Sequence, residues 1–439
     1  MTVEVPISGG PHVPDEEPAR GPGPVPVPAA LVQALEAELP AAVALRHALH
    51  REPRVSGDET DSRDAVADAL GRTLEPVAGT GGLLRLGGAG PAVAVRGELD
   101  ALPVHEATGL PFASRRDGVA HVCGHDVHTA ALVALTRAVA TAPDLLGAPL
   151  LAVFQPREEA APSGAADVVT DAAFRDHDPA VMLGVHVQPE LPRGVVSARP
   201  GPVNASADEI EITVAGQAGH GGYPHRTRDP VLAIAAVVVA LQQIVARRVN
   251  PLEAGVVTVG QITAGSAPNV VPGSASARGT VRALDADRDD LLAAVREVVT
   301  HTAAAHGCTG EVTVVPNEPA VVNDERLTAA IAATLGGRRG AERAAPTGLR
   351  LDTGFRSCGA DDFSHYSAAG IPATMLFVGT AEPDAVPGRA PGLHHPAFSP
   401  DDAMVGEVAR ALLAAVVAAG QTLPASHAPQ RPSPDGGTS

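Results

Sequence analysis

Short apolar segments alternate with helical stretches along much of this 439-residue chain. The segments 92–99, 150–156 and 181–187 are bounded by turn residues, as is typical of buried strands. Helical patterns at 128–141 and 163–174 lie between them. Because a helix usually connects successive parallel strands, this alternation predicts an α/β domain whose mostly parallel sheet carries helices on both faces.

The pattern changes near residue 206. Strand, helix, strand, strand, helix and strand then follow in the segments "DEIEITVAG", 229–246, "AGVVTVGQI", "SASARGTVRAL", 286–306 and "GEVTVV". This is the order of a ferredoxin-like unit, which predicts an inserted α+β domain.

These changes in pattern set the expected domain boundaries. The inserted domain should cover 206–315, and the α/β domain should be formed by 29–205 and 316–424. The Pro-rich segments 1–28 and 425–439 are expected to be a disordered leader and a disordered tail.

Composition restricts the partners and the compartment. A net charge of −18 argues against nucleic acid, whose affinity depends on basic side chains. Three cysteines form no disulfide framework and fit a reducing compartment. The start of the chain lacks the basic and apolar regions of a signal peptide, and the apolar run 231–245 is too short to span a bilayer. We therefore expect a cytoplasmic protein that binds neither nucleic acid nor membrane.

The segment "HVCGHDVHTA" at 121–130 raises the question of metal binding. A cysteine thiolate and imidazole nitrogens are good ligands for a zinc-like ion, and Cys123 and His125 share one short turn. By itself the segment is weak support, because a histidine in a turn is more often solvated or capping. Cys123 could equally be an inert buried thiol.

Other polar residues follow the predicted strands. They are Asp100 in "RGELDALPVHE", Glu158 and Glu159 in "FQPREEA", His186 in "LGVHVQPE", and His394 and His395 in "PGLHHPAF". Each alone could be a solvated turn residue or a core histidine. Together they should converge on the carboxyl edge of one sheet, where open α/β folds place their ligands. The full set therefore favours a metal site.

The chain resembles the aminoacylase and carboxypeptidase superfamily of metallopeptidases from about residue 30 to 420. The resemblance is carried in order by "LHREPRVSGDET", "DALPVHEATGLPFAS", "HVCGHDVHTAAL", "FQPREE", "GVHV", "AGHGGYPHRTRDP", "GSAPNVVPGSASARGTVR", "GADDFSHY" and "LHHPAF". It is strongest to the amidohydrolase branch, which comprises hippurate, N-acyl-amino-acid and indole-acetyl-amino-acid hydrolases. It implies a zinc-peptidase-like, mixed-sheet α/β catalytic domain with an inserted ferredoxin-like lid that mediates dimerisation.

The resemblance also implies roles for individual residues. The ligands of one or two divalent metal ions, Mn²⁺ or Zn²⁺, would be Cys123, His125, Glu159, His186 and His394. Glu158 would be the general base, and Asp100 would orient the metal centre. His220 would reach the active site of a partner subunit, and Asn269, Arg282 and His225 would contact the substrate. The alternatives are a solvated Arg282 and ordinary turn residues at His220 and His225.

These roles predict a metal-dependent amidohydrolase that cleaves N-acyl amino acids, because a metal activates water and polarises a carbonyl. A dipeptidase or a deacetylase of another small amide, and a non-catalytic metal- or ligand-binding dimer, remain alternatives. A hydrolase with Cys123 as nucleophile is less favoured, since His125 is poorly placed two residues away in the same turn. Glu98, Arg157 and Asp361 depart from the family pattern, so we expect specificity or metal affinity to differ.

Overall fold

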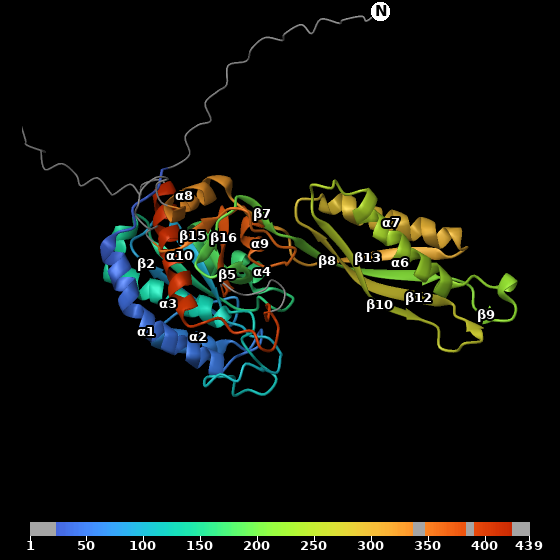
Figure 1. Cartoon of the computed structure of the whole chain (residues 1–439), viewed down its shortest axis with the longest axis horizontal. Helices are drawn as coiled ribbons and strands as arrows, with labels where there is room; N and C mark the ends of the chain where they lie inside the picture. The colour runs from blue at the N-terminus through green and yellow to red at the C-terminus, as the bar shows by residue number, and fades with distance from the viewer. Residues whose placement is uncertain (1–22, 337–346, 383–389, 424–439) are drawn as a thin grey trace, which may run out of the picture.

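The computed structural model describes residues 23–336, 347–382 and 390–423, and the chain forms two domains within them. A larger α/β domain and an elongated α+β lid lie side by side along the long axis of the molecule (Figure 1). The predicted disordered tail, and all but the last six residues of the predicted leader, lie outside the described residues.

The larger domain is built on an eight-stranded mixed sheet in the order β1-β2-β4-β3-β5-β16-β6-β15. These strands are Glu75–Val77, Gly81–Leu86, Leu150–Gln155, Ala92–Glu98, Pro179–Pro192, Ala373–Ala381, Val195–Ser197 and Arg350–Asp352, in that order. The central neighbours β4, β3, β5 and β16 run parallel, whereas β1, β2 and β4 pair antiparallel. The expected α/β fold class is confirmed.

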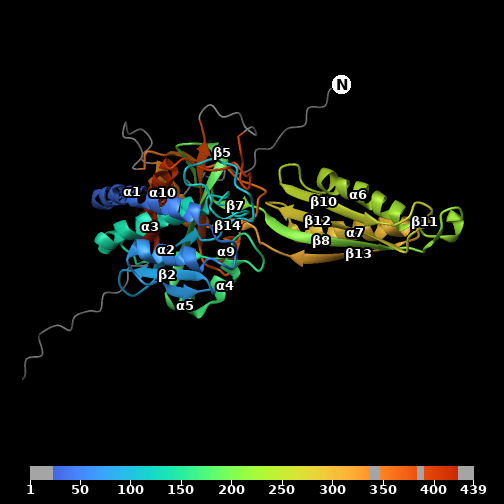
Figure 2. The ribbon, with the colours of Figure 1, turned by 90° about the horizontal axis from the view of Figure 1, so that it is seen from below.

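Helices cover both faces of this sheet. They are α1 (Ala29–Arg51), α2 (Thr60–Leu70), α3 (His125–Thr141), α4 (Gly164–Thr170), α5 (Ala172–Asp176), α8 (Glu325–Gly336), α9 (Ser364–Ala368) and α10 (Ala403–Thr422), with a 3-10 turn at Pro143–Leu146. In β3, Val93 and Val95 pack toward α1, α3 and α10, whereas Ala92 and Ala94 pack toward α4, α5 and α9. Figure 2 shows α1, α3 and α10 grouped on one side.

Pro40 behaves differently from expectation. A proline inside a helical segment usually interrupts the helix, but α1 continues through Pro40. Pro40 is exposed, whereas Leu35, Ala42 and Leu45 on the inner side of the helix are buried. Burial of this apolar side outweighs the backbone hydrogen bond that proline cannot donate.

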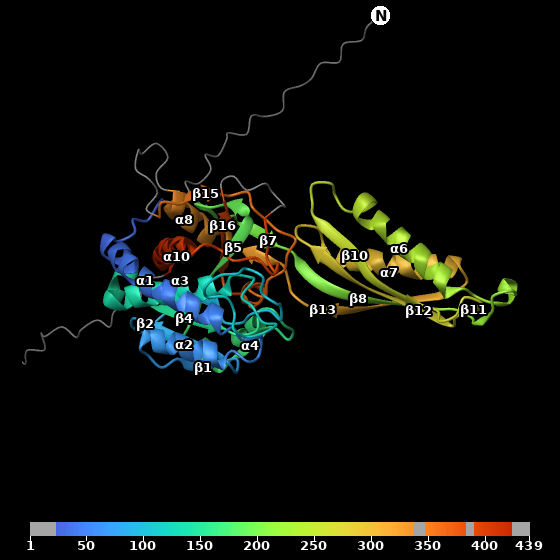
Figure 3. The same cartoon turned by 60° about the horizontal axis from the view of Figure 1, so that its bottom comes forward.

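The lid contains a four-stranded antiparallel sheet in the order β10-β12-β8-β13. Its elements are β8 (Ser206–Ala215), α6 (Pro230–Arg247), β10 (Gly255–Ala264), β12 (Ser274–Ala283), α7 (Arg288–Ala305) and β13 (Thr309–Pro316). A ribbon of β9 (Gly219–His220) and β11 (Val270–Val271), with a 3-10 turn at Pro224–Arg226, lies at the end remote from the larger domain (Figure 3). The order of elements is that of the predicted ferredoxin-like unit.

Two chain segments join the domains. The chain enters the lid after β7 (Gly201–Asn204), leaves it after β13, and then forms β14 (Val321–Asn323), which pairs with β7. The N–H of Ala207, at the start of β8, donates to the carbonyl of Glu318 at 2.7 Å, so the segment that leaves the lid is bonded to the strand that enters it. An ion pair between Arg356 and Asp285 also links the domains.

Two helices are long and apolar enough to cross a membrane by length and composition alone. Helix α10 lies in the core, with 83% of the relevant window buried, whereas only 33% of the α6 window is buried. The outer side of α6 is therefore an exposed apolar surface.

Candidate metal centre

The polar residues that follow the central strands meet at one edge of the larger sheet. Asp100 comes two residues after β3, Glu158 and Glu159 follow β4, and His186 lies within β5. Because these three strands are parallel neighbours, their carboxyl ends bring the side chains together.

A tight turn before α3 places Cys123 and His125 over the same edge. The turn passes through Gly124 in the left-handed region, with φ of 97°. A Cβ atom at this position would lie 2.4 Å from Cγ2 of Val187. Only glycine can therefore bring the turn this close to β5, which carries His186.

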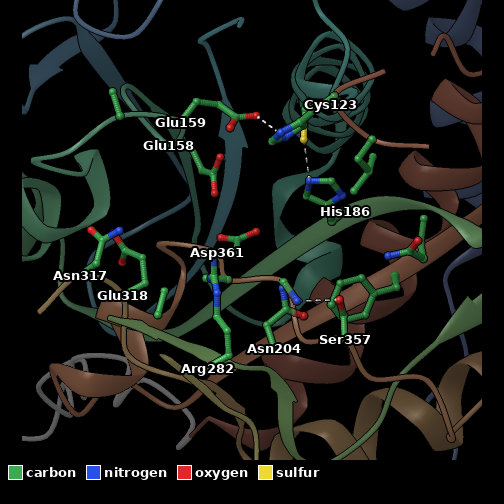
Figure 4. Close-up of a pocket in the computed structure, with 18 of the residues that line it drawn as sticks. Cys123, Glu158, Glu159, His186, Asn204, Arg282, Asn317, Glu318, Ser357 and Asp361 are labelled. Carbon is green, nitrogen blue, oxygen red and sulfur yellow. Dashed lines mark hydrogen bonds and ion pairs between the residues drawn. The ribbon is translucent and has the colours of Figure 1, made fainter. Parts of the chain in front are cut away.

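The five expected ligand residues belong to overlapping groups of neighbouring donor atoms. Figure 4 shows three of them, Cys123, Glu159 and His186, close together. Sγ of Cys123 is 3.4 Å from Nε2 of His186, and Nε2 of His394 is 3.2 Å from Oε1 of Glu159. Nε2 of His125 lies 3.9 Å from the same Glu159 oxygen and 3.8 Å from Oε2 of Glu158.

Backbone carbonyls orient the two buried histidines. Nδ1 of His125 donates to the carbonyl of Asp100 at 2.9 Å, and Nδ1 of His186 donates to the carbonyl of Val187 at 2.7 Å. Since a carbonyl can only accept, the proton of each neutral ring lies on Nδ1. Nε2 of each neutral ring then carries a lone pair that can bind a cation.

The Asp100 carboxylate contacts both His125 and the backbone of Glu159. Its Oδ1 lies 3.3 Å from Nδ1 of His125, and its Oδ2 accepts from Ser56 at 2.7 Å and from the N–H of Glu159 at 2.9 Å. Burial alone would raise the pKa of Asp100, but the contacts with His125, Glu159 and Ser56 lower it. Asp100 therefore remains an anion that orients neighbouring groups.

The donor atoms fit a divalent cation. Among the described residues, Nε2 of His125 and Oε1 of Glu159 are buried without a hydrogen-bond partner. Burial lowers the pKa of His186 to about 4, so its ring is neutral at physiological pH. Thiol, imidazole and carboxylate donors form a set that zinc-like ions accept, and a cation would satisfy the unpaired buried atoms.

The cluster does not resemble the activated thiol of a cysteine hydrolase. Burial, together with the charge of Glu159, raises the pKa of Cys123 well above its usual range. A nucleophilic cysteine needs the opposite shift.

A buried ionic network beneath the cluster was not foreseen. Arg96 is fully buried and lies 2.6 Å from Glu98, 2.7 Å from Asp361 and 2.9 Å from Asp362. Two residues that depart from the family pattern, Glu98 and Asp361, thus share one guanidinium. An arginine within the apolar strand "AVAVRGEL" was the available signal, because a buried charge needs partners.

Glu158 faces this network. Burial and then the charges of Asp361 and Glu159 raise the pKa of the Glu158 carboxyl well above its usual range. A raised pKa makes a carboxyl group a better proton acceptor, as a general base requires.

A cavity of about 460 Å³ adjoins the cluster. Cys123, Glu158, Glu159, His186 and His394 line one side of it. On the other side Arg282 enters from β12 of the lid, beside Asn204 (Figure 4). Arg282 is thus the one expected lid residue that reaches the cavity of its own chain.

His220, His225 and Asn269 lie elsewhere. His220 belongs to β9 and pairs with Val270 of β11. The carbonyl of Asn269 accepts the N–H of Gly221 at 2.8 Å, and His225 lies in the exposed turn that follows. This end of the lid points away from the larger domain (Figure 1). One chain alone does not bring these three residues to its own cavity.

The model of peptidase family M20/M25/M40 matches residues 94–417. The chain belongs to this family. Its fold resembles that of a dinuclear metal-binding M20 peptidase from Bacillus subtilis, with 28% identity and a TM-score of 0.73 over 88% of this chain and 100% of that chain. A putative aminohydrolase from methicillin-resistant Staphylococcus aureus gives 29% identity and a TM-score of 0.79 over 89% and 99% of the two chains.

Sequence relatives of this M20 protein include two named deacetylases. An N-acetyldiaminopimelate deacetylase of Exiguobacterium sibiricum is 33% identical over 82% of this chain and 94% of its own length. An N-acetyl-L-cysteine deacetylase of Bacillus subtilis is 33% identical over 83% and 84%. Membership confirms the expected family resemblance, the lid-bearing fold and the prediction of a metal-binding hydrolase that acts on amide bonds.

Proposed function

We propose that this M20 protein hydrolyses N-acyl amino acids to a carboxylic acid and a free amino acid. The observation that carries the proposal is the position of Glu158 beside five ligand-type side chains, in a cavity that Arg282 enters from the opposite side. The deacetylase relatives act on N-acetyl compounds by name, which supports the same chemistry here.

We assign one or two divalent ions, Mn²⁺ or Zn²⁺, to Cys123, His125, Glu159, His186 and His394. When bound, such an ion polarises an amide carbonyl and makes water more acidic. Thiolate and imidazole donors favour zinc, whereas carboxylate donors also suit manganese.

The chain's own groups account for the remaining steps. Glu158 accepts a proton from the attacking water and returns it to the leaving amine nitrogen. Asp100 keeps His125 in the required orientation. The guanidinium of Arg282 binds the substrate carboxylate through two parallel hydrogen bonds, which places the scissile amide near Glu158.

We assign the exposed side of α6 to a dimer interface formed by the lid. Leu232 is 60% exposed and Val239 is 73% exposed. An exposed apolar surface of this kind is typical of an interface. The adjacent β10 is an edge strand of the lid sheet, so a second copy can cover both.

The same dimer would give His220, His225 and Asn269 a role. Since these residues are remote from their own cavity, we assign them to the cavity of the partner subunit. There His220 would donate to the oxyanion that develops on the amide oxygen.

We further propose a cytoplasmic enzyme without nucleic-acid or membrane partners. The net charge of −18 and the three free cysteines support this assignment.

The test is amine release from N-acetyl, N-benzoyl and indole-acetyl amino acids by metal-stripped protein reloaded with Mn²⁺ or Zn²⁺. We expect metal-dependent turnover that Glu158→Gln abolishes. Turnover of dipeptides in preference to every acyl amino acid would favour the dipeptidase alternative. Stoichiometric metal binding with no hydrolysis of any amide would favour a non-catalytic dimer.

A further inference from the structure

The side of the cavity opposite the candidate metal ligands is polar. We call it the polar wall and define it as Asn204, Arg282, Asn317, Glu318 and Ser357. Figure 4 shows these residues across the cavity from Glu159 and Cys123. Phe377 also lines the cavity, outside the polar wall.

The polar wall is held in place by the segments that join the domains. Asn204 ends β7, and Asn317 and Glu318 follow β13. Ala207, at the start of β8, exchanges two backbone hydrogen bonds with the segment that follows β13: its N–H donates to the carbonyl of Glu318 at 2.7 Å, and its carbonyl accepts the N–H of Asn317 at 3.3 Å. The polar side chains therefore start from paired backbone, which fixes their positions before a ligand binds.

Two members of the polar wall, Asn204 and Glu318, have side-chain oxygens that can accept further hydrogen bonds. Asn204 is only 7% exposed, and its Oδ1 has no hydrogen-bond partner among the described residues. The Glu318 side chain is 12% exposed, and its Oε2 lies 2.7 Å from Nε2 of His365. The other Glu318 oxygen remains for the cavity. Burying such groups against an apolar ligand is unfavourable.

Charge narrows the class of ligand. Arg282 provides one positive charge, which the substrate α-carboxylate would neutralise. The Asp361 carboxylate already accepts two hydrogen bonds from Arg96, at 2.7 and 3.1 Å. Glu318 is the one acidic member of the polar wall, where it would repel an anionic side chain and attract a cationic one.

We propose that the polar wall binds a cationic side chain, so that the preferred substrates are Nα-acyl derivatives of basic amino acids with a primary ammonium group. The ammonium donates to Glu318 and Asn204 while Arg282 holds the α-carboxylate. This inference rests on the proposed function and adds the class of amino acid to it.

The test compares kcat/KM for Nα-acetyl-L-lysine, Nα-acetyl-L-norleucine and Nα-acetyl-L-glutamate with the metal-loaded, full-length protein. We expect lysine to exceed norleucine by at least about tenfold, because hydrogen bonds to charged groups are strong, and glutamate to be the poorest. In Glu318→Gln the lysine-to-norleucine ratio should fall by about tenfold, and in Asn204→Leu it should fall less. The matched control is Glu209→Gln, an exposed carboxylate of β8, which should keep the wild-type ratio.

Competitive inhibition by the free amino acids gives a second measurement. L-Lysine should inhibit more strongly than L-norleucine, and Glu318→Gln should remove the difference. Equal or better turnover of norleucine, or an unchanged ratio in folded Glu318→Gln, would overturn the inference while leaving the proposed function intact. Absence of turnover with every acyl amino acid would instead overturn the proposed function, and the inference with it.

Discussion

The backbone N–H of His394 donates a hydrogen bond to the carbonyl of Val122 across 2.8 Å. This bond joins a late loop to the turn that carries Cys123, although the two are far apart in the sequence. His394 adopts φ of 65°, a strained conformation for a residue other than glycine. The protein thus stabilises the position of one candidate ligand through backbone contacts with the segment that carries two others.

Arg46 also links the first turn of α3 to the segment that follows the His394 loop. It is fully buried and donates to Asp126 at 3.1 Å, to Asp402 at 2.8 Å and to the carbonyl of Pro400 at 2.6 Å. We expect Arg46→Met to lower the free energy of unfolding by about 3–5 kcal/mol, because the buried Asp126 carboxylate loses its guanidinium partner and keeps only His50. Metal affinity should fall as well, since Asp126 follows His125 in the first turn of α3.

Denaturant unfolding and calorimetric metal titration would measure these two effects. The matched control is Arg410→Met, which removes an exposed ion pair with Glu36. Such a pair contributes at most about 1 kcal/mol. Equal losses of stability in the two variants would contradict the role given to Arg46.

Asp100→Asn should weaken metal binding more than it weakens the fold. Asparagine keeps the volume but loses the charge beside His125 and one acceptor for Ser56 or Glu159. Loss of such an orienting carboxylate typically lowers metal affinity or activity about 10- to 100-fold. Competition with a chelator measures the affinity, and thermal unfolding of the metal-free protein measures the fold. An unchanged affinity would show that Asp100 does not orient the site.

His50 predicts a pH dependence of stability. Burial alone would lower its pKa, but the Asp126 carboxylate at 2.9 Å, with help from Glu106, raises it. The folded protein therefore keeps the His50 proton to higher pH than the unfolded chain does. The resulting stabilisation is complete below the ordinary pKa of 6.5 and is lost as the pH rises through the folded value.

Unfolding of metal-free protein at several pH values above and below 6.5 would test this sign. His50→Gln should lose more stability at the acidic end of the series than at the alkaline end. If the difference in the free energy of unfolding between wild type and variant is the same at every pH, His50 does not titrate as described.

The dimer proposal predicts complementation between two inactive variants. His220→Ala keeps its own Glu158, and Glu158→Gln keeps its own His220. If His220 acts in the partner's cavity, each mixed dimer has one intact site, and random mixing should restore about a quarter of wild-type activity. The readout is turnover after the two variants are co-refolded in equal amounts. No recovery in verified mixed dimers would place His220 outside the partner's site.

The exposed side of α6 can be tested separately. Val239→Asp places a charge where the proposed interface is apolar, so sedimentation should show monomers in place of dimers. Gln242→Glu is a matched control, because Gln242 is exposed on the same helix but its change removes no apolar surface. A Val239→Asp protein that stays dimeric would exclude this side of α6.

Much of the larger domain could be anticipated because its signals are local. Apolar segments of the sequence indicated strands β3, β4 and β5. The polar residues that follow them lie at one edge of the sheet, because neighbouring parallel strands end at the same edge. The pairing of β6 with both β15 and β16 could not be predicted in this way, since the positions of such short strands depend on tertiary contacts. The continuity of α1 through Pro40 depends in the same way on packing against the core.

Residues without a local signal were missed for the same reason. Arg96 and Asp361 are 265 positions apart, and only the fold shows that they bond. Glu318 and Asn204 lie in segments that looked like simple connections between domains. The roles assigned to Cys123, His125 and the other candidate ligands remain predictions that metal binding must test.

The most direct test of the account measures bound metal and hydrolysis in the same samples as metal-free protein is titrated with Zn²⁺ or Mn²⁺. We predict that turnover of the best N-acyl amino acid rises in proportion to bound metal. Glu158→Gln should bind nearly as much metal and hydrolyse at least about 10²-fold more slowly, as expected for loss of a general base. Cys123→Ala should lose metal and turnover together. Turnover that is independent of bound metal, or full activity in Glu158→Gln, would contradict the account.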